Sequence, residues 1–121
     1  MPHSTEIEQR LNHLFLQRPA GVRDQLEVKK MFGGLAYLYR GKMSVGILGE
    51  SLIARIPAAS MDEALQRAGA RPMDFTGRVM KEFVFVEPEG FRTDAELAQW
   101  IDWGLEHARQ ALAPEKPQKN R

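Results

Sequence analysis

Three basic side chains, Arg55, Arg78 and Lys81, are the residues best suited by type and spacing to bind a ligand. Side chains alternate between the two faces of a strand, so Arg55 points away from the apolar positions of residues 51–56, and Lys81 shares a face with aromatic residues of 79–86. If both faces lie on the open side of one sheet, the three cations form a shallow patch for an anion or a partner. The alternative is that they are solvated charges that discourage edge pairing.

Gly33 and Gly34 invite comparison with a phosphate-binding loop. Such loops precede a helix, whose N-terminal N–H groups face the anion. Here the glycines precede residues 35–40, which have the composition of a strand. We therefore favour a tight connection between two strands that needs a positive φ.

The chain has three histidines, His3, His13 and His107, and their positions match no catalytic or metal-binding pattern. The chain has no Cys, and none of its histidines has a second His at metal-binding spacing. His107 shares a predicted helix face with Trp103, beside Asp102 and Glu106, and we interpret it as a partly exposed helix residue. No serine can be assigned to a particular histidine as a nucleophile. We therefore expect no enzyme activity, no metal and no cofactor.

Tyr37 and Tyr39 alternate with Leu38 and precede two basic residues, Arg40 and Lys42. Aromatic side chains beside cations can stack unpaired bases, so a nucleic-acid interface is an alternative. Packing within the core and a hairpin is the use that we prefer.

Composition indicates one compact domain. The chain has 121 residues and a net charge of +1, from 17 Lys and Arg against 16 Asp and Glu, without the basic excess that phosphate backbones favour. Its start is polar and no stretch has 18 consecutive apolar residues, so we expect no secretion signal and no membrane span. A cytoplasmic location follows.

Three helices are predicted from Ser/Thr-x-x-Glu capping boxes at Thr5, Ser60 and Thr93. The first should end by Arg18, before Pro19, and the last has apolar residues at helical spacing to residue 112.

Five strands are predicted, at residues 26–31, 35–40, 43–48, 51–56 and 79–86. Two-residue gaps at Gly41-Lys42 and Gly49-Glu50 suit type II′ hairpins. The order α-β-β-β-β-α-β-α predicts an α+β domain over residues 1–113, with two layers and a mainly antiparallel five-stranded sheet. Residues 114–121 contain two Pro and no apolar residue, which predicts a disordered tail.

The fifth predicted strand is apolar on both faces at residues 83–86. Helices of the chain would cover one face, and a second copy of the sheet could cover the other. This pattern predicts a homodimer.

The motifs in this order resemble the TfoX N-terminal domain family. The resemblance rests on Met31-Phe32-Gly33-Gly34, on Gly41-Lys42-Met43, on residues 75–86, and on Pro88-Glu89-Gly90 before a helix with Trp100. Glu82 departs from the pattern, which has a small residue there. The resemblance implies a two-layer fold like that of secretion chaperones, and kinship with bacterial competence regulators that act on transcription with the cyclic-AMP receptor protein. It implies no catalytic residues. Those regulators have a second, helical domain, which we do not expect after residue 113.

The expected function is a non-catalytic regulatory domain that binds a protein partner and modulates transcription through it. The alternatives are a nucleic-acid-associated accessory factor and a binder of a small anionic ligand.

Overall fold

The computed structural model describes residues 4–31, 33–75 and 78–112, without the side chains at 74–75, 78–80 and 112. Its helices are α1 (Thr5–Leu16), α2 (Ala20–Arg23), α3 (Met61–Leu65) and α4 (Asp94–Leu112). Its strands are β1 (Leu26–Met31), β2 (Gly34–Tyr39), β3 (Lys42–Leu48), β4 (Ser51–Arg55), β5 (Ala70–Phe75) and β6 (Arg78–Val86). No helix in the described ranges has both the length and the apolar character to cross a membrane.

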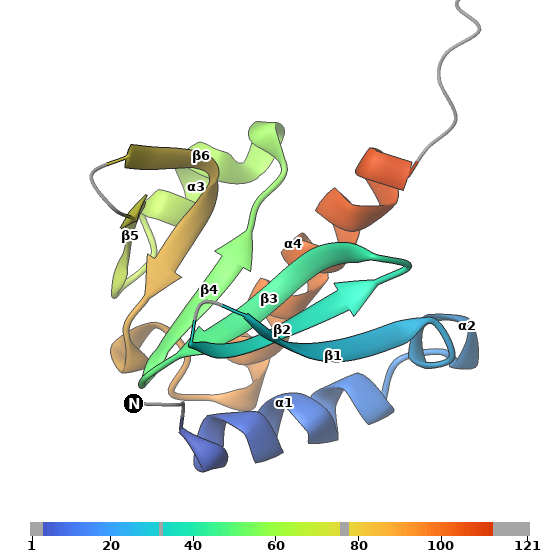
Figure 1. Ribbon diagram of the computed structural model, residues 1–121. Helices are drawn as coiled ribbons and strands as arrows, with labels where there is room; N and C mark the ends of the chain where they lie inside the picture. The colour runs from blue at the N-terminus through green and yellow to red at the C-terminus, as the bar shows by residue number, and fades with distance from the viewer. Residues whose placement is uncertain (1–3, 32, 76–77, 113–121) are drawn as a thin grey trace, which may run out of the picture.

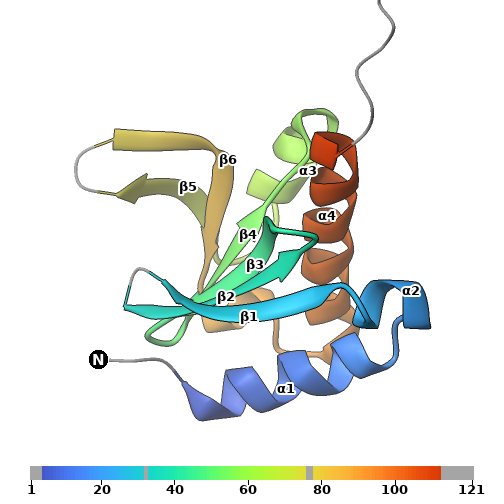
Figure 2. The ribbon, with the colours of Figure 1, turned by 45° about the vertical axis from the view of Figure 1, so that its right-hand side comes forward.

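The six strands form one antiparallel sheet in the order β1-β2-β3-β4-β6-β5. Helices α1 and α4 lie on the same side of this sheet, with α1 beneath β1 and β2 (Figure 1). Strand β6 bends, so that its hairpin with β5 rises from the other side of the sheet (Figure 2). The α+β class is confirmed, and the sheet has six strands instead of the predicted five.

Strand β5 is the element that the sequence did not predict. Its residues, ARPMDF, include a proline and two charged side chains, which are uncommon in strands. It forms because the long strand β6 offers a pairing edge, and the register shifts between Pro72 and Met73, where β6 contains the extra residues 81–83. Helix α2 was also not predicted. The predicted tail at residues 114–121 lies outside the described residues.

The two predicted hairpin turns have different conformations. Arg40 and Gly41 have φ values of 52° and 87°, so they form the central pair of a type I′ turn, and the prediction of a type II′ turn at Gly41-Lys42 was wrong. Gly49 has φ 63° and Glu50 has no positive φ, which agrees with the type II′ turn predicted there.

Of the three predicted capping boxes, the one at Thr93 is confirmed. The Thr93 hydroxyl accepts a hydrogen bond from the Glu96 N–H, and the Glu96 carboxylate accepts one from the Thr93 N–H, each at 3.1 Å. At the first helix Ser4 replaces Thr5 as the cap, and its hydroxyl accepts from the Ile7 N–H. Ser60 makes no side-chain capping hydrogen bond. Helix α1 ends at residue 16, within the predicted limit.

The sheet separates two apolar cores. The larger core joins α1 and α4 to one face of the strands, with Trp100, Leu11 and Val84 among its fully buried members. The smaller core lies on the other face and contains only strand residues, among them Met73 and Phe85. Both faces of β6 are therefore covered by the chain itself. The apolar character that suggested a homodimer through this strand has an intramolecular cause.

Helix α4 approaches β3 very closely at Gly104. A Cβ at this position would lie 2.4 Å from the carbonyl oxygen of Ser44. Ser44 is the extra residue of a bulge between β2 and β3, and its buried hydroxyl donates a hydrogen bond to the Tyr37 carbonyl at 2.8 Å. The absence of a side chain at 104 thus sets the distance between helix and sheet.

Candidate functional site

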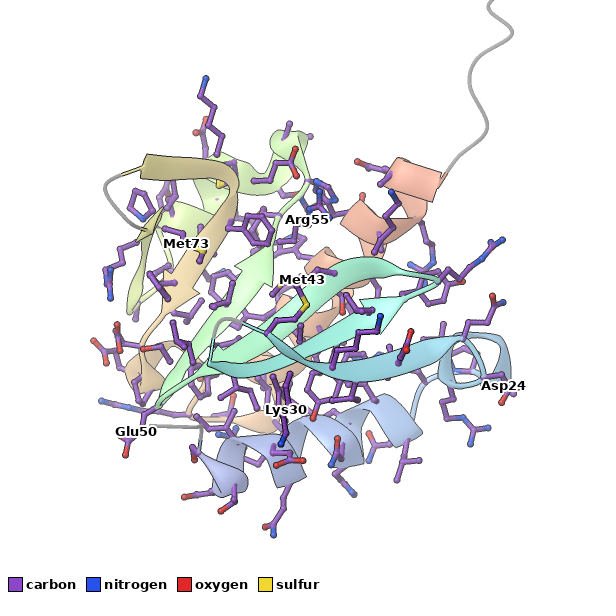
Figure 3. All side chains as sticks on the ribbon, viewed as in Figure 1. Asp24, Lys30, Met43, Glu50, Arg55 and Met73 are labelled. Atoms are coloured by element: carbon purple, nitrogen blue, oxygen red, sulfur yellow. The ribbon has the colours of Figure 1, made fainter. Side chains whose placement is uncertain are left out.

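Two of the three predicted patch residues lie together. Arg55, at the end of β4, is directly opposite Phe83 of β6, and the alternation predicted for residues 51–56 agrees with the division of their apolar members between the two cores. Arg55 and Lys81 line an open depression of about 350 Å³ with Glu82 and Phe83. Arg55 is labelled in Figure 3. Arg78 is the first residue of β6, and its side chain is outside the described part of the chain.

The Arg55 guanidinium in this depression already has an anionic partner. Its Nε and Nη2 donate hydrogen bonds to Glu82 Oε1 at 2.9 and 2.7 Å, and its Cζ lies 5.4 Å from the centre of the Phe83 ring. The hydrogen bond from Arg55 holds the pKa of Glu82 below its usual value. An incoming anion would have to displace this carboxylate, so the patch is poorly suited to anions. Its role in binding stays a prediction.

His107 of α4 completes this polar cluster. Its Nε2 lies 3.4 Å from Glu82 Oε1, an ionic contact only when the imidazole is protonated. Burial, and then the charge of Arg55, lower the pKa of His107, which favours the neutral ring. His13 contacts Gln17 instead, and His3 is outside the described residues. The described residues contain no group of three side chains able to hold a metal ion.

The motif residues Met31, Gly33, Gly34, Gly41 and Trp100 have structural roles. Gly33 has φ 80°, and a Cβ on Gly34 would overlap the Ile47 carbonyl of β3, so the pair forms the predicted connection between strands. Met31 packs against the smaller core. The buried Trp100 indole donates a hydrogen bond to the Gly90 carbonyl at 3.0 Å. Phe32 lies outside the described residues.

An apolar groove lies between α1 and β1, at the edge of the sheet. It has a volume of about 240 Å³ and is lined by Asn12, Phe15, Leu16, Arg23, Leu26, Val28 and Tyr37. Among the described residues, Leu16 and Val28 are the large apolar side chains that stay exposed, at 66% and 46%. Both of them belong to this groove, so the exposed apolar surface is concentrated in one place.

The base of the groove is rigidly built. The Phe15 and Tyr37 rings stack with centroids 5.1 Å apart and an angle of 11° between their planes. Burial raises the pKa of Tyr37, so its phenol stays protonated and donates a hydrogen bond to Asn12 Oδ1 at 2.7 Å. A preformed apolar groove with one fixed polar group is typical of a binding surface.

The strand beside the groove has a free edge. Within the described part of the chain, β1 pairs only with β2, in a continuous register over all six of its residues. The Arg40 N–H donates to the Gln25 carbonyl, so the odd-numbered residues of this segment face β2. The backbone groups of Leu26, Val28 and Lys30 therefore point outwards. We call this edge, together with Leu16, the β1 edge surface.

Sequence reasoning missed the β1 edge surface, although one signal was present. The buried face of α1 consists of Ile7, Leu11, Leu14 and Phe15. Leu16 lies outside this face and is an apolar residue on the solvent side of its helix. The sequence could not show that the end of α1 lies beside residue 28, because that proximity depends on the order of the strands.

Comparison with curated proteins and with solved structures gave no significant match. The family model for the TfoX N-terminal domain matches residues 20–108, which is most of the 121-residue chain and lies within the predicted domain of residues 1–113. The matched range begins in α2, includes the whole sheet and reaches into the last turns of α4. The chain belongs to the TfoX N-terminal domain family.

Proposed function

We propose that this chain is a non-catalytic protein-interaction domain with a regulatory role, and that its contact surface is the β1 edge surface. The observation that carries the proposal is the placement of Leu16 and Val28. These exposed apolar side chains line one groove, next to a strand whose outward backbone groups pair with no other strand of the described chain. Proteins recognise extended segments in this way, with main-chain hydrogen bonds for affinity and neighbouring pockets for specificity.

The charged surface gives less support to the alternatives. Arg55, Arg10 and Arg71 each contact a carboxylate, at 2.7, 3.5 and 2.9 Å respectively. Cations that are already paired offer less to phosphate groups, which weakens the anionic-ligand alternative. The nucleic-acid alternative is weakened because Tyr37, one of its two stacking residues, is buried. Modulation of transcription through a protein partner, in the cytoplasm of a bacterium, remains part of this proposal, and the resemblance to competence regulators is its support.

The test is a pull-down with the tagged chain from native lysate, with and without nuclease. The bait variant carries Leu16→Ser and Val28→Ser, and a matched control carries Lys81→Ala in the other candidate site. We expect a protein partner that survives nuclease, is captured by the wild type and the control, and is lost with the double variant. Capture that the double variant retains would contradict the proposed surface. Capture that disappears after nuclease would support the nucleic-acid alternative instead.

A further inference from the structure

The two edges of the sheet differ in how well they can accept a neighbouring strand. At the β5 edge, the Glu87 N–H donates to the Gly69 carbonyl, so the outward positions are Ala70 and Pro72. Pro72 has no N–H to offer there, so a neighbouring strand would lose a hydrogen bond at the middle of this edge. The β1 edge has no such feature, and its register with β2 is unbroken. A proline, a bulge or a cover is the usual protection of an edge.

The side chains of β1 carry opposite charges two residues apart. Glu27 and Lys29 lie on the same face of the strand, with Oε2 and Nζ 3.9 Å apart, and both are more than half exposed. Lysines on an edge strand usually oppose pairing. Lys29 stops opposing it when it meets a carboxylate on the incoming strand.

We propose that the β1 edge surface binds a second copy of the same chain, with β1 antiparallel to β1 of its partner about a two-fold axis through Val28. This inference rests on the proposed interaction function and names the partner of its surface. A two-fold axis that relates antiparallel strands is perpendicular to the sheet. Two residues that lie opposite each other then point to the same face of the sheet. Residues on one face of β1 differ by an even number, so the numbers of two opposite residues add up to an even number.

Among the registers that satisfy this rule, the one centred on Val28 is favoured by charge. It places Glu27 opposite the partner's Lys29, and Lys29 opposite the partner's Glu27. The two neighbouring registers that satisfy the rule are centred on Lys29 and on Glu27. They would place Lys29 opposite Lys29, or Glu27 opposite Glu27, and such contacts between like charges are unfavourable. The favoured register also brings the exposed Val28 side chains of the two copies together.

The backbone geometry fits the same register. Val28 faces Val28 of the partner, and Leu26 faces the partner's Lys30, and these are the residues whose N–H and C=O groups point outwards. Directly opposite residues that both point to the partner form hydrogen-bonded pairs in an antiparallel sheet. Lys30 lies on the α1 side of the strand (Figure 3), so its aliphatic stem can cover the partner's Leu26. Leu16 would lie beside the axis, next to the two Val28 side chains.

The first experiment uses charge reversal and light scattering on the purified full chain. The wild type should be a dimer at micromolar to millimolar concentration. Glu27→Lys alone and Lys29→Glu alone should each raise the Kd of the dimer about tenfold or more, because two attractive pairs become two repulsive ones. An equimolar mixture of the two variants should form a heterodimer, since every Lys of one copy then faces a Glu of the other.

The mixture excludes a merely structural effect of the substitutions. Each single variant also loses the pair between Glu27 and Lys29 within its own chain, and mixing does not restore that pair. A wild type that stays monomeric up to about 1 mM, which corresponds to a very weak complex, would overturn the inference. So would single variants that dimerise like the wild type, or a mixture that behaves like its separate components.

The register has its own test, because the chain contains no Cys. Val28→Cys places two thiols directly opposite each other across the axis, within the Cα separation that a disulfide tolerates. Lys30→Cys on the same strand is the matched control, since its partner across the interface is Leu26. Under mild oxidation we expect covalent dimers of the Val28 variant and much slower dimerisation of the Lys30 variant. Equal rates would contradict the register.

The outcomes separate this inference from the proposed function. If the chain is monomeric but the variant with Leu16→Ser and Val28→Ser still loses its captured protein, the surface binds a different protein and the dimer is wrong. If the dimer forms as described and no protein is captured, the self-association stands and the regulatory partner is lost.

Discussion

Replacement of Gly104 by alanine tests the close contact between α4 and β3. The new Cβ would lie 2.4 Å from the carbonyl oxygen of Ser44 and 2.7 Å from its carbonyl carbon. Both atoms belong to the backbone of a central strand. Ser44 is also fully buried and is held by its hydrogen bond to the Tyr37 carbonyl, so it has little freedom to move away. The helix must therefore shift outwards.

The expected change in stability is the sum of two opposing effects. Alanine is better than glycine in a helix interior by about 1 kcal/mol. Overpacking costs about 1–3 kcal/mol, and the upper value applies here because the overlap is with backbone and displaces the helix that covers the sheet. We therefore expect Gly104→Ala to lower the free energy of unfolding by about 2 kcal/mol.

Urea unfolding followed by tryptophan fluorescence measures this effect, because Trp100 and Trp103 both lie on α4. With a denaturant slope of about 2 kcal/mol per molar, the midpoint should fall by about 1 M. Gly21→Ala in α2 is the matched control, since a Cβ there meets nothing within 4 Å. That change should stabilise the protein by about 0.4–1 kcal/mol. A Gly104→Ala variant as stable as the wild type would refute the reasoning.

Three further substitutions test local interactions, and the same urea assay measures each of them. Thr93→Ala should lower the free energy of unfolding by about 1 kcal/mol, because the helix loses its capping hydrogen bond. Ser60→Ala should leave the urea midpoint unchanged, because the Ser60 side chain makes no capping hydrogen bond. Equal effects of the two substitutions would contradict this prediction. Trp100→Phe should cost about 1–3 kcal/mol, because it leaves the Gly90 carbonyl unpaired in the core. Burial and a neighbouring guanidinium hold the pKa of His107 in the folded protein below its ordinary value of 6.5. The neutral His107 ring therefore contributes to stability above pH 6.5, and this contribution is lost as the pH falls through the pKa of the folded state. His107→Gln should flatten this decline in stability between neutral and mildly acidic pH, and an unchanged decline would contradict the assignment.

The meander of β1 to β4 was predictable because its signals are local. Two-residue gaps with glycine separate short runs of aliphatic and aromatic residues, so each strand was placed to within about two residues. The type of turn was harder, because Arg40 adopts a positive φ that is uncommon outside glycine. Here the register of the neighbouring strands decides the conformation.

The elements that escaped prediction depend on contacts between distant residues. Strand β5 has little strand character of its own and exists because β6, which pairs with β4 along one edge, offers its other edge. The candidate site shows the same limit. The face of Arg55 followed from alternation along residues 51–56, whereas the pairing of Arg55 with Glu82 and the free edge of β1 required the strand order.

The proline on the outward side of β5 has a consequence for the size of any assembly. A sheet with two open edges can add chains at both ends, and repetition of one contact then builds a fibre. In this chain Pro72, which has no N–H to donate, stands at an outward position of the β5 edge and opposes pairing at that end of the sheet. Two copies that meet through β1 would form a twelve-stranded sheet with a β5 strand at each end, and growth would stop at the pair.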